Sequence, residues 1–247
     1  MSGGVSPSGA AGAEQSATWV KSMFGRIAPR YDLLNHVLSF QADRYWRWRT
    51  ARRFRDLLAR PDAVVLDICC GSGDLMLALR RNGEARVFGS DFCHPMLLEA
   101  RRKTGVPAAP PLFEADALRL PVRDRSLDLI AAAFGFRNLV DYRGGLREML
   151  RALKPGGKAA ILEFTQPPNP FFRASYNFYS RRLLPLIGGL VSGSRESYVY
   201  LPDSVERFPP APQLAEGMRV AGFEEVEFTY LTAGVAALHI GAAPRSG

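Results

Sequence analysis

Acidic residues end two neighbouring apolar segments of this chain, and a glycine turn follows the first of them. Asp67 lies in segment 64–68, which passes through Gly71 and Gly73 into a helix with periodic apolar residues, and Asp91 ends the next apolar segment. This order of strand, glycine turn, helix and strand is typical of a β-α-β unit that holds a nucleotide at the carboxyl ends of its strands. The pattern therefore predicts a site for a cofactor that contains adenosine.

The glycine pattern discriminates among adenosine cofactors. A dinucleotide site uses a third glycine, three residues after the second, to pack helix and strand over a pyrophosphate. No such glycine follows Gly71 and Gly73. No Lys-Ser or Lys-Thr pair follows them, so the turn is not a phosphate loop. S-adenosylmethionine carries no phosphate and needs close backbone approach and carboxylates. We predict that Asp67, Gly71 and Gly73 bind it and that Asp91 accepts both ribose hydroxyls. The alternative is an ordinary α/β turn with an acid at the start of its helix.

Strands and helices alternate along most of the chain, which predicts an α/β fold with a largely parallel sheet. We expect seven strands, at 64–68, 86–90, 112–115, 129–133, 158–164, 224–231 and 235–241, and intervening helices at 73–82, 95–103, 143–153 and 211–220. The last two strands are joined by the short link Thr232-Ala233-Gly234, which suits an antiparallel hairpin.

Four parts make up the predicted domain organisation. They are a disordered leader at 1–17, an N-terminal helical lid at 18–60 whose last helix begins near Asp43, a Rossmann-like core at 61–165 and 207–247, and an apolar helical insertion at 166–206. The insertion could line a pocket for a long apolar substrate or could be a buried helix pair.

Composition limits the class of protein. The leader has no basic start or apolar core, so it is not a signal peptide. The longest nearly uncharged apolar stretch, 183–191, is far shorter than the ~20 residues that cross a bilayer. The cysteines, Cys69, Cys70 and Cys93, fit neither a disulfide framework nor a zinc-ligand spacing. For Cys69 and Cys70, small buried side chains are a better interpretation than reactive thiols. We expect a cytoplasmic protein.

Positive charge is concentrated near the N-terminus. The formal net charge is +8, and residues 21–60 carry ten Lys or Arg against three Asp, interleaved with Tyr31, Tyr45, Trp46 and Trp48. Such a segment could contact an anionic membrane surface or nucleic acid, or it could be a solvated helix face whose aromatic residues pack inside. Charge alone does not decide among these.

Further polar residues reach the same edge of the predicted sheet. Asp116 follows the third strand and could accept a hydrogen bond from the adenine amino group. The run Phe134-Gly135-Phe136-Arg137-Asn138 follows the fourth strand. We expect these last residues to face the methyl end of the cofactor.

Several motifs resemble those of one family, the demethylmenaquinone and 2-polyprenyl-6-methoxybenzoquinol C-methyltransferases of menaquinone and ubiquinone biosynthesis. The similarity covers about residues 22 to 241 and rests on Arg30-Tyr31-Asp32, the turn 67–74, Phe136-Arg137-Asn138, Lys154-Pro155-Gly156-Gly157, Leu162-Glu163-Phe164 and Tyr198-Val199-Tyr200-Leu201-Pro202. It implies a class I S-adenosylmethionine-dependent methyltransferase fold, with cofactor contacts at Ser72, Asp91, Asp116 and Ala117. Cys69-Cys70 departs from the small Ala or Gly pair usual in the family.

The resemblance implies that the substrate is a prenylated hydroquinone. We predict substrate contacts at Tyr31, His36, Phe136, Tyr176 and Tyr198. Methyl transfer to a ring carbon requires an electron-rich ring, so a group of the protein must stabilise the oxyanion that forms when a hydroxyl proton leaves.

We assign this stabilisation to Arg137 and Asn138, since an arginine stays protonated. The base is Asp74, acting through a water molecule, or His36. Structural alternatives are that Asp74 caps its helix, that Arg137 pairs with Asp141, and that His36 is an ordinary helix histidine.

The preferred function is methylation of demethylmenaquinol to menaquinol. The same chemistry on the ubiquinone precursor or on another phenol or lipid stays open. A base-methylating enzyme would carry an Asn/Asp-Pro-Pro-Tyr/Phe turn after the fourth strand, where this chain has 134–138, so we expect no nucleic-acid partner. A non-catalytic cofactor-binding scaffold is the other alternative. A homodimer and peripheral contact with the inner face of the membrane are both left open.

Overall fold

A seven-stranded sheet forms the centre of the computed structural model, which describes residues 12–28, 32, 36, 39–104, 111–183 and 195–245. The strand order is β3-β2-β1-β4-β5-β7-β6, with β7 antiparallel to both of its neighbours and the other pairs parallel. The strands are β1 (Val64–Ile68), β2 (Arg86–Asp91), β3 (Leu112–Glu114), β4 (Leu127–Ala133), β5 (Leu153–Phe164), β6 (Glu224–Leu231) and β7 (Ala236–Ala242). The predicted fold class is confirmed.

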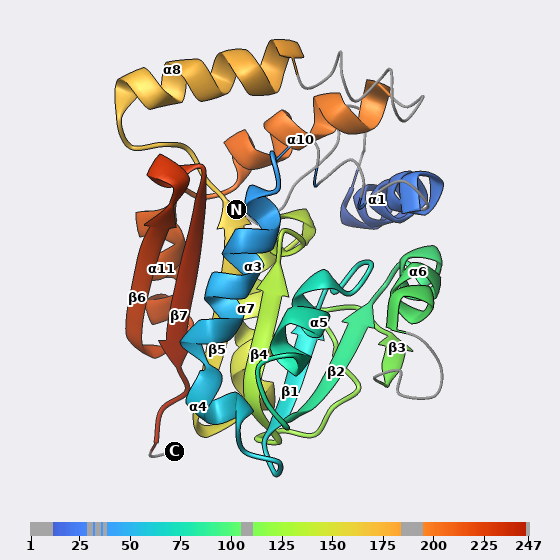
Figure 1. Ribbon diagram of the computed structural model, residues 1–247, viewed down its shortest axis with the longest axis vertical. Helices are drawn as coiled ribbons and strands as arrows, with labels where there is room; N and C mark the ends of the chain where they lie inside the picture. The colour runs from blue at the N-terminus through green and yellow to red at the C-terminus, as the bar shows by residue number, and fades with distance from the viewer. Residues whose placement is uncertain are drawn as a thin grey trace.

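Helices cover both faces of this sheet (Figure 1). On one face lie α3 (Ala42–Arg53), α4 (Arg55–Leu58) and α5 (Asp74–Arg80), and on the other α7 (Tyr142–Ala152) and α11 (Ala211–Val220). Because both faces are covered, β4 buries successive residues on opposite sides: Ile130 packs with α7 and α11, and Leu129 with α3 and α5. Burial on both faces explains why this strand is a continuous apolar run in the sequence.

The remaining described α-helices lie beyond the carboxyl end of β2 or at the carboxyl edge of the sheet. They are α1 (Ala13–Ile27), α6 (His94–Thr104), α8 (Pro170–Phe178) and α10 (Arg195–Arg207). In Figure 1, α8 and α10 cross above the upper ends of the strands, and α1 lies above α6. Among the described residues no helix is both long enough and apolar enough to cross a membrane.

Two local predictions need correction, and one is confirmed. The leader prediction extends too far, because α1 begins at Ala13 and buries Ser16, Val20 and Met23. A helix does begin near Asp43, as predicted, since α3 begins at Ala42; the Asp43 carboxylate pairs with Arg47. Strand β5 begins at Leu153, earlier than the Lys154-Pro155-Gly156-Gly157 turn suggested.

The insertion is described only in part, because residues 184–194 lie outside the described residues. Its first helix, α8, has no buried residue, which does not fit a buried helix pair over that stretch. The π-helical turn η3 (Tyr179–Leu183) continues it. A second helix, α10, returns toward the site and packs against the 3₁₀ turn η2 (Phe136–Asn138).

Candidate functional site

A cleft opens where β1, β2 and β4 end. The residues that line it include Asp67, Cys69, Cys70, Gly71, Ser72, Asp74, Asp91, Asp116, Ala117, Phe134, Gly135 and Asn138. The structure therefore brings together every residue predicted from the glycine turn and the two strand-end acids except Gly73, which is the N-cap residue of α5 and is not among the lining residues. Gly71 and Gly73 have positive φ angles of 55° and 85°, which side chains rarely adopt, so the turn requires glycine at both positions.

Asp91 holds the turn in place. Its carboxylate accepts hydrogen bonds from the Gly71 amide (2.8 Å) and the Cys93 amide (2.8 Å), one on each oxygen. Burial raises its pKa to about 6, and these backbone hydrogen bonds oppose the rise. Each carboxylate oxygen has a second lone pair. The geometry thus fits a carboxylate that is held by the backbone on one side and accepts ribose hydroxyls on the other.

Asp67 is fully buried beside the cleft, and neither of its oxygens accepts a well-formed hydrogen bond among the described residues. Burial raises its pKa well above the ordinary value, with the Met76 amide and Arg47 opposing the rise. Buried polar groups without partners are rare in folded proteins. A cationic or hydrogen-bonding ligand in the cleft would satisfy this carboxylate, and the ammonium group of S-adenosylmethionine is such a ligand.

The other three predicted cofactor residues, Ser72, Asp116 and Ala117, also line the cleft. Asp116 is exposed and its Oδ1 accepts from the Leu118 amide (2.9 Å), which fixes the loop after β3. Ala117 is buried beside it. The Ser72 hydroxyl donates to Asp32 and accepts from Lys103 Nζ (3.1 Å), so this side chain ties the turn to the Arg30-Tyr31-Asp32 motif.

Cys69 and Cys70 carry thiols, not thiolates, since burial and the nearby acids Asp67 and Asp91 raise both pKa values well above the ordinary value. Cys69 has a positive φ of 51°. Both cysteines are free. The predicted interpretation as a small buried side chain fits Cys70, whereas Cys69 is only partly buried and lines the cleft.

The loop after β4 approaches the glycine turn very closely at Gly135. A Cβ atom on Gly135 would lie 2.5 Å from the Cys69 Cβ and 3.1 Å from the Cys69 carbonyl oxygen. This contact explains why a glycine stands between the two phenylalanines of the 134–138 run.

We expect Gly135→Ala to displace the loop from the turn and to weaken cofactor binding at least about tenfold, with about 1–3 kcal/mol lost from the free energy of unfolding. Calorimetric titration with S-adenosylmethionine and denaturant unfolding measure the two effects. Gly217→Ala in α11 is the matched control, because its nearest neighbour would lie 3.6 Å away. Equal affinities for Gly135→Ala and the unmodified protein would contradict the packing argument.

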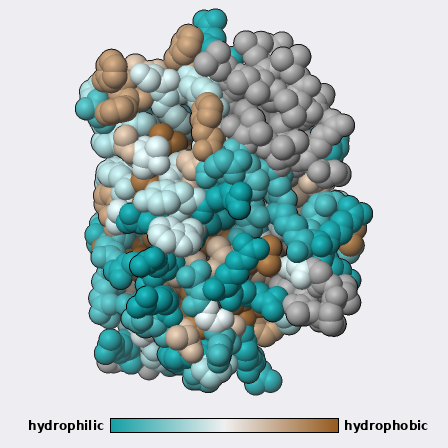
Figure 2. Space-filling model, in the orientation of Figure 1, coloured by the Kyte–Doolittle hydropathy of each residue, from teal (hydrophilic) through white to brown (hydrophobic). Residues whose placement is uncertain are grey.

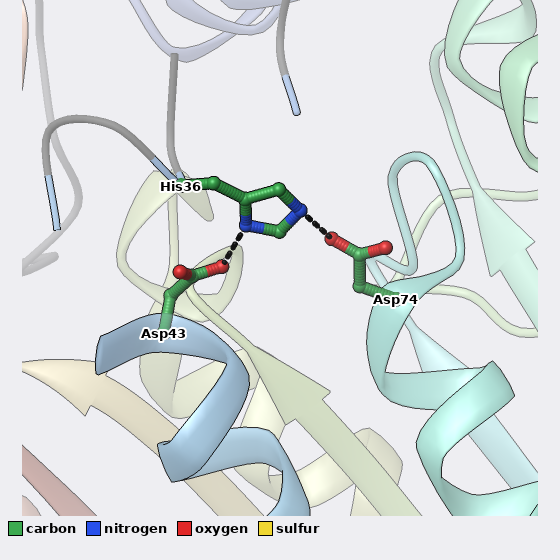
Figure 3. Close-up of side chains that lie close together, drawn as sticks. All are labelled: His36, Asp43 and Asp74. Atoms are coloured by element: carbon green, nitrogen blue, oxygen red, sulfur yellow. Dashed lines mark hydrogen bonds and ion pairs between the residues drawn. The ribbon is translucent and has the colours of Figure 1, made fainter. Parts of the chain in front are cut away.

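A histidine lies between two carboxylates at the rim of the cleft (Figure 3). His36 Nδ1 is 2.8 Å from Asp43 Oδ2, and His36 Nε2 is 3.9 Å from Asp74 Oδ2. A proton on Nδ1 donated to Asp43 leaves Nε2 as the basic nitrogen, facing Asp74. Both base candidates from the sequence therefore lie side by side.

Each of these two carboxylates also has a cationic partner. Arg47 Nη1 lies 2.5 Å from Asp43 Oδ2, and Lys103 Nζ lies 2.5 Å from Asp74 Oδ1. Lys103 also contacts Asp32 Oδ2 at 2.5 Å. Arg47 and Ser39 hold the pKa of Asp43 below its usual value although burial opposes this. His36 therefore lies between two carboxylates that are each held by a cationic side chain.

Arg137 does not line the cleft. Its guanidinium is 4% exposed, lies 3.0 Å from Glu163 Oε2 and donates to Ser204 Oγ (3.2 Å) and to the Phe134 carbonyl. The structural alternative of a pair with Asp141 is wrong, because Asp141 pairs with Arg147. The predicted contact with a substrate oxygen does not fit this buried position.

Asn138 does reach the cleft, and its Oδ1 accepts a hydrogen bond from the Tyr200 hydroxyl (3.1 Å). Burial raises the pKa of Tyr200 to about 12, so the hydroxyl stays a donor. With its oxygen engaged, the Asn138 amide is oriented to present its NH₂ group. An amide donor at this place could stabilise an oxyanion.

The remaining predicted substrate residues are placed differently. Phe136 is fully buried in the core beneath α7, so it supports η2 and does not face the cleft. Tyr176 is half-buried near Arg137, and burial raises its pKa to about 12. Tyr31 and the side chain of Tyr198 lie outside the described residues.

Sequence reasoning missed Lys103, Asp43 and Glu163 as parts of the site. Lys103 is one of several basic residues at the end of its helix, and nothing in its local pattern distinguishes it. Glu163 stands in a motif used for the resemblance, but its pairing with Arg137 joins β5 to the turn η2 and is not a local signal.

The sheet order, the glycine turn after β1 and the acid at the end of β2 define an S-adenosylmethionine-dependent methyltransferase, and S-adenosylmethionine is its methyl donor. The chain matches the ubiE/COQ5 methyltransferase family over residues 11–243 and belongs to that family.

Similar proteins support this placement. A demethylmenaquinone methyltransferase of Thermus thermophilus is 48% identical over 225 residues, covering 90% of this chain and 100% of that protein. A demethylmenaquinone methyltransferase of Deinococcus radiodurans is 46% identical over 224 residues, covering 90% of this chain and 91% of that protein. Among solved structures, the cyclase SpnF has a TM-score of 0.62 at 19% identity, covering 91% of this chain and 96% of that chain, which shows likeness of fold alone.

Proposed function

We propose that this protein transfers a methyl group from S-adenosylmethionine to a ring carbon of a prenylated hydroquinone, demethylmenaquinol, to give menaquinol. The names of the relatives support the substrate. The observation that carries the chemistry is that Asp74 lines the cofactor cleft with His36 directly behind it. A proton acceptor therefore stands beside the place where the methyl donor binds.

S-adenosylmethionine, when bound, supplies an electrophilic methyl carbon attached to a sulfonium. Asp67, Asp91 and Asp116 would hold its charged and polar ends, and the glycine turn allows its close approach. The protein's own task is to make the ring carbon nucleophilic and to align it. Positioning of this kind is worth ~7–11 kcal/mol in favourable cases.

The hydroxyl proton of the quinol passes to the pair formed by Asp74 and His36. Asp43 fixes the tautomer of His36, and a proton on Nε2 is stabilised by Asp74 at 3.9 Å. The Asn138 amide, held by Tyr200, stabilises the resulting oxyanion. Arg137 does not contact the substrate in this proposal. It donates to the Phe134 carbonyl and holds the start of η2, and so it positions Asn138.

One assay tests the function itself. Purified protein receives labelled S-adenosylmethionine together with either reduced demethylmenaquinone or the reduced benzoquinone precursor of ubiquinone, and the ring carbon that gains the label is identified. We expect label on the naphthoquinol ring. Transfer to the benzoquinol alone would replace the proposed substrate, and transfer to neither ring would reject the proposal.

We expect His36→Ala to lower kcat about a hundredfold or more, since general-base catalysis typically contributes 10²–10⁴-fold. The affinity for S-adenosylmethionine should stay unchanged, because His36 does not line the cleft. His94→Ala is the control: that imidazole is exposed and pairs with Glu114. Turnover by His36→Ala at the rate of the unmodified protein would remove the histidine from proton transfer.

The proposed place of action is the cytoplasm, in peripheral contact with the inner face of the membrane and without a nucleic-acid partner. A prenylated quinol partitions into lipid, so the enzyme must meet its substrate at the bilayer surface.

A further inference from the structure

Helix α8 presents large aromatic side chains to solvent. Phe171 is 75% exposed and Phe178 62% exposed, Phe172 is also exposed, and no residue of α8 is buried. Figure 2 shows hydrophobic side chains gathered at the upper left of the molecule, where α8 lies in Figure 1. A soluble monomer rarely exposes several large apolar side chains together unless the patch has a partner.

A second exposed aromatic group lies on the outer face of α3. Tyr45 and Trp48 stack with ring centroids 6.0 Å apart, and Arg49 and Arg52 lie over their rings. With Arg44, these residues follow the one-turn spacing of a single helix face. The opposite face of α3, which includes Trp46, is buried in the core.

One contact joins these two groups into a single surface. Phe40 is 79% exposed, and its ring centroid lies 5.8 Å from that of Tyr179, in the turn that continues α8. Phe40 lies two residues before α3 in the chain. We call the exposed side chains of α8, Phe40 and the outer face of α3 the aromatic-basic face.

This face is positively charged. Segment 170–183 contains Arg173, Arg181 and Arg182 and no acidic residue. On α3, no acidic residue among the described part of the chain forms an ion pair with Arg44, Arg49 or Arg52. Arg181 does pair with Glu206, so its charge is partly balanced. Aromatic rings with arginines at their edges suit the boundary between lipid headgroups and acyl chains, with anionic headgroups as the counter-charge.

The same helix connects this face to the cleft. Arg47 lines the cleft, and Asp43 holds His36, from the inner side of α3. In Figure 1, α8 and the first turn of α3 both lie at the carboxyl edge of the sheet, where the cleft opens. A lipid surface against the aromatic-basic face would therefore lie close to the site of methyl transfer.

We propose that the aromatic-basic face docks on an anionic lipid bilayer, with Phe171, Phe172, Phe178 and Phe40 in the interfacial layer and the arginines of α3 on the headgroups. This inference deepens the proposed function. Only one part of it, the delivery of a prenylated quinol from the bilayer to the cleft, rests on the proposed function. The binding itself is independent of catalysis.

Vesicle sedimentation tests the binding. The full chain is mixed with vesicles of phosphatidylcholine alone or of phosphatidylcholine with phosphatidylglycerol. We expect binding to the anionic vesicles that falls as salt is added. Binding should drop at least about tenfold in Phe171→Ser/Phe172→Ser/Phe178→Ser, which removes apolar area, and in Arg44→Gln/Arg49→Gln/Arg52→Gln, which removes charge.

Val220→Ser is the matched control, because Val220 is 79% exposed on α11, away from this face, and its substitution should leave vesicle binding unchanged. Circular dichroism confirms that each variant is folded. No binding by the unmodified chain, equal binding to neutral vesicles, or retention of binding by both triple variants would overturn the proposal. A dimer in sedimentation velocity that is lost in the phenylalanine variant, without vesicle binding, would assign the face to a second copy instead.

Kinetics separate this proposal from the proposed function. With a water-soluble quinol that lacks the prenyl tail, both triple variants should turn over at the rate of the unmodified enzyme. With a long-tailed quinol in anionic vesicles, their apparent KM should rise at least about tenfold while kcat stays unchanged. No turnover of any quinol by the unmodified enzyme would reject the proposed function and leave the vesicle-binding result standing.

Discussion

Replacing Arg137 with alanine is expected to lower the free energy of unfolding by about 3–5 kcal/mol, the usual cost of removing one partner of a buried ion pair. Glu163 is 1% exposed, and its Oε1 and Oε2 both lie within hydrogen-bond distance of Arg137. Without the guanidinium, Glu163 would be a buried carboxylate with only backbone donors. The Phe134 carbonyl and the Ser204 hydroxyl would also lose a donor.

Denaturant unfolding measures this loss, and Arg147→Ala provides the comparison. Arg147 pairs with Asp141 at 3.4 Å, and both side chains are well exposed, so that substitution should cost no more than about 1 kcal/mol. Arg137→Ala should also reduce turnover, because η2 no longer holds Asn138 in place. Full stability together with lost turnover would contradict the structural role and restore the direct contact with the substrate oxygen that the sequence suggested.

The fold could be predicted from sequence because its signals are local. Each strand of the parallel part is a short apolar run between turn residues, and the helices have apolar residues at helical spacing. The acids Asp67 and Asp91 end adjacent strands, and adjacent parallel strands end at one edge of the sheet. The cofactor half of the site follows from these facts alone.

The other half of the site depends on contacts between distant segments. Whether Arg137 points into the cleft or into the core is decided by Glu163 on the neighbouring strand and Ser204 on α10. The direction of Phe136 is likewise set by the short 3₁₀ turn and the helix packed on it. A motif shows that Phe136-Arg137-Asn138 matters, but not which of its side chains faces the cleft. Of these three residues, only Asn138 lines the cleft.

The affinity for S-adenosylmethionine is expected to fall as the pH drops below about 6, the pKa to which burial raises Asp91. Ribose hydroxyls donate hydrogen bonds, so the bound state favours the carboxylate. Above the pKa the free protein already carries that carboxylate, and affinity should not depend on its titration. Below the pKa, binding must displace a proton, and affinity should fall by up to tenfold per pH unit.

Calorimetric titration one unit above and one unit below that pKa measures this dependence, and two substitutions identify its source. Asp91→Asn should bind S-adenosylmethionine about a hundredfold more weakly or worse, because two charge-assisted hydrogen bonds are lost. Its amide NH₂ would also face the N–H group of either Gly71 or Cys93, where the carboxylate accepts from both. The affinity that Asp91→Asn retains for S-adenosylmethionine should not change with pH near this pKa. Asp116→Asn leaves Asp91 intact, so its affinity should still fall below this pKa. If the pH dependence of affinity instead vanished in Asp116→Asn and persisted in Asp91→Asn, the titrating group would be Asp116 and not Asp91.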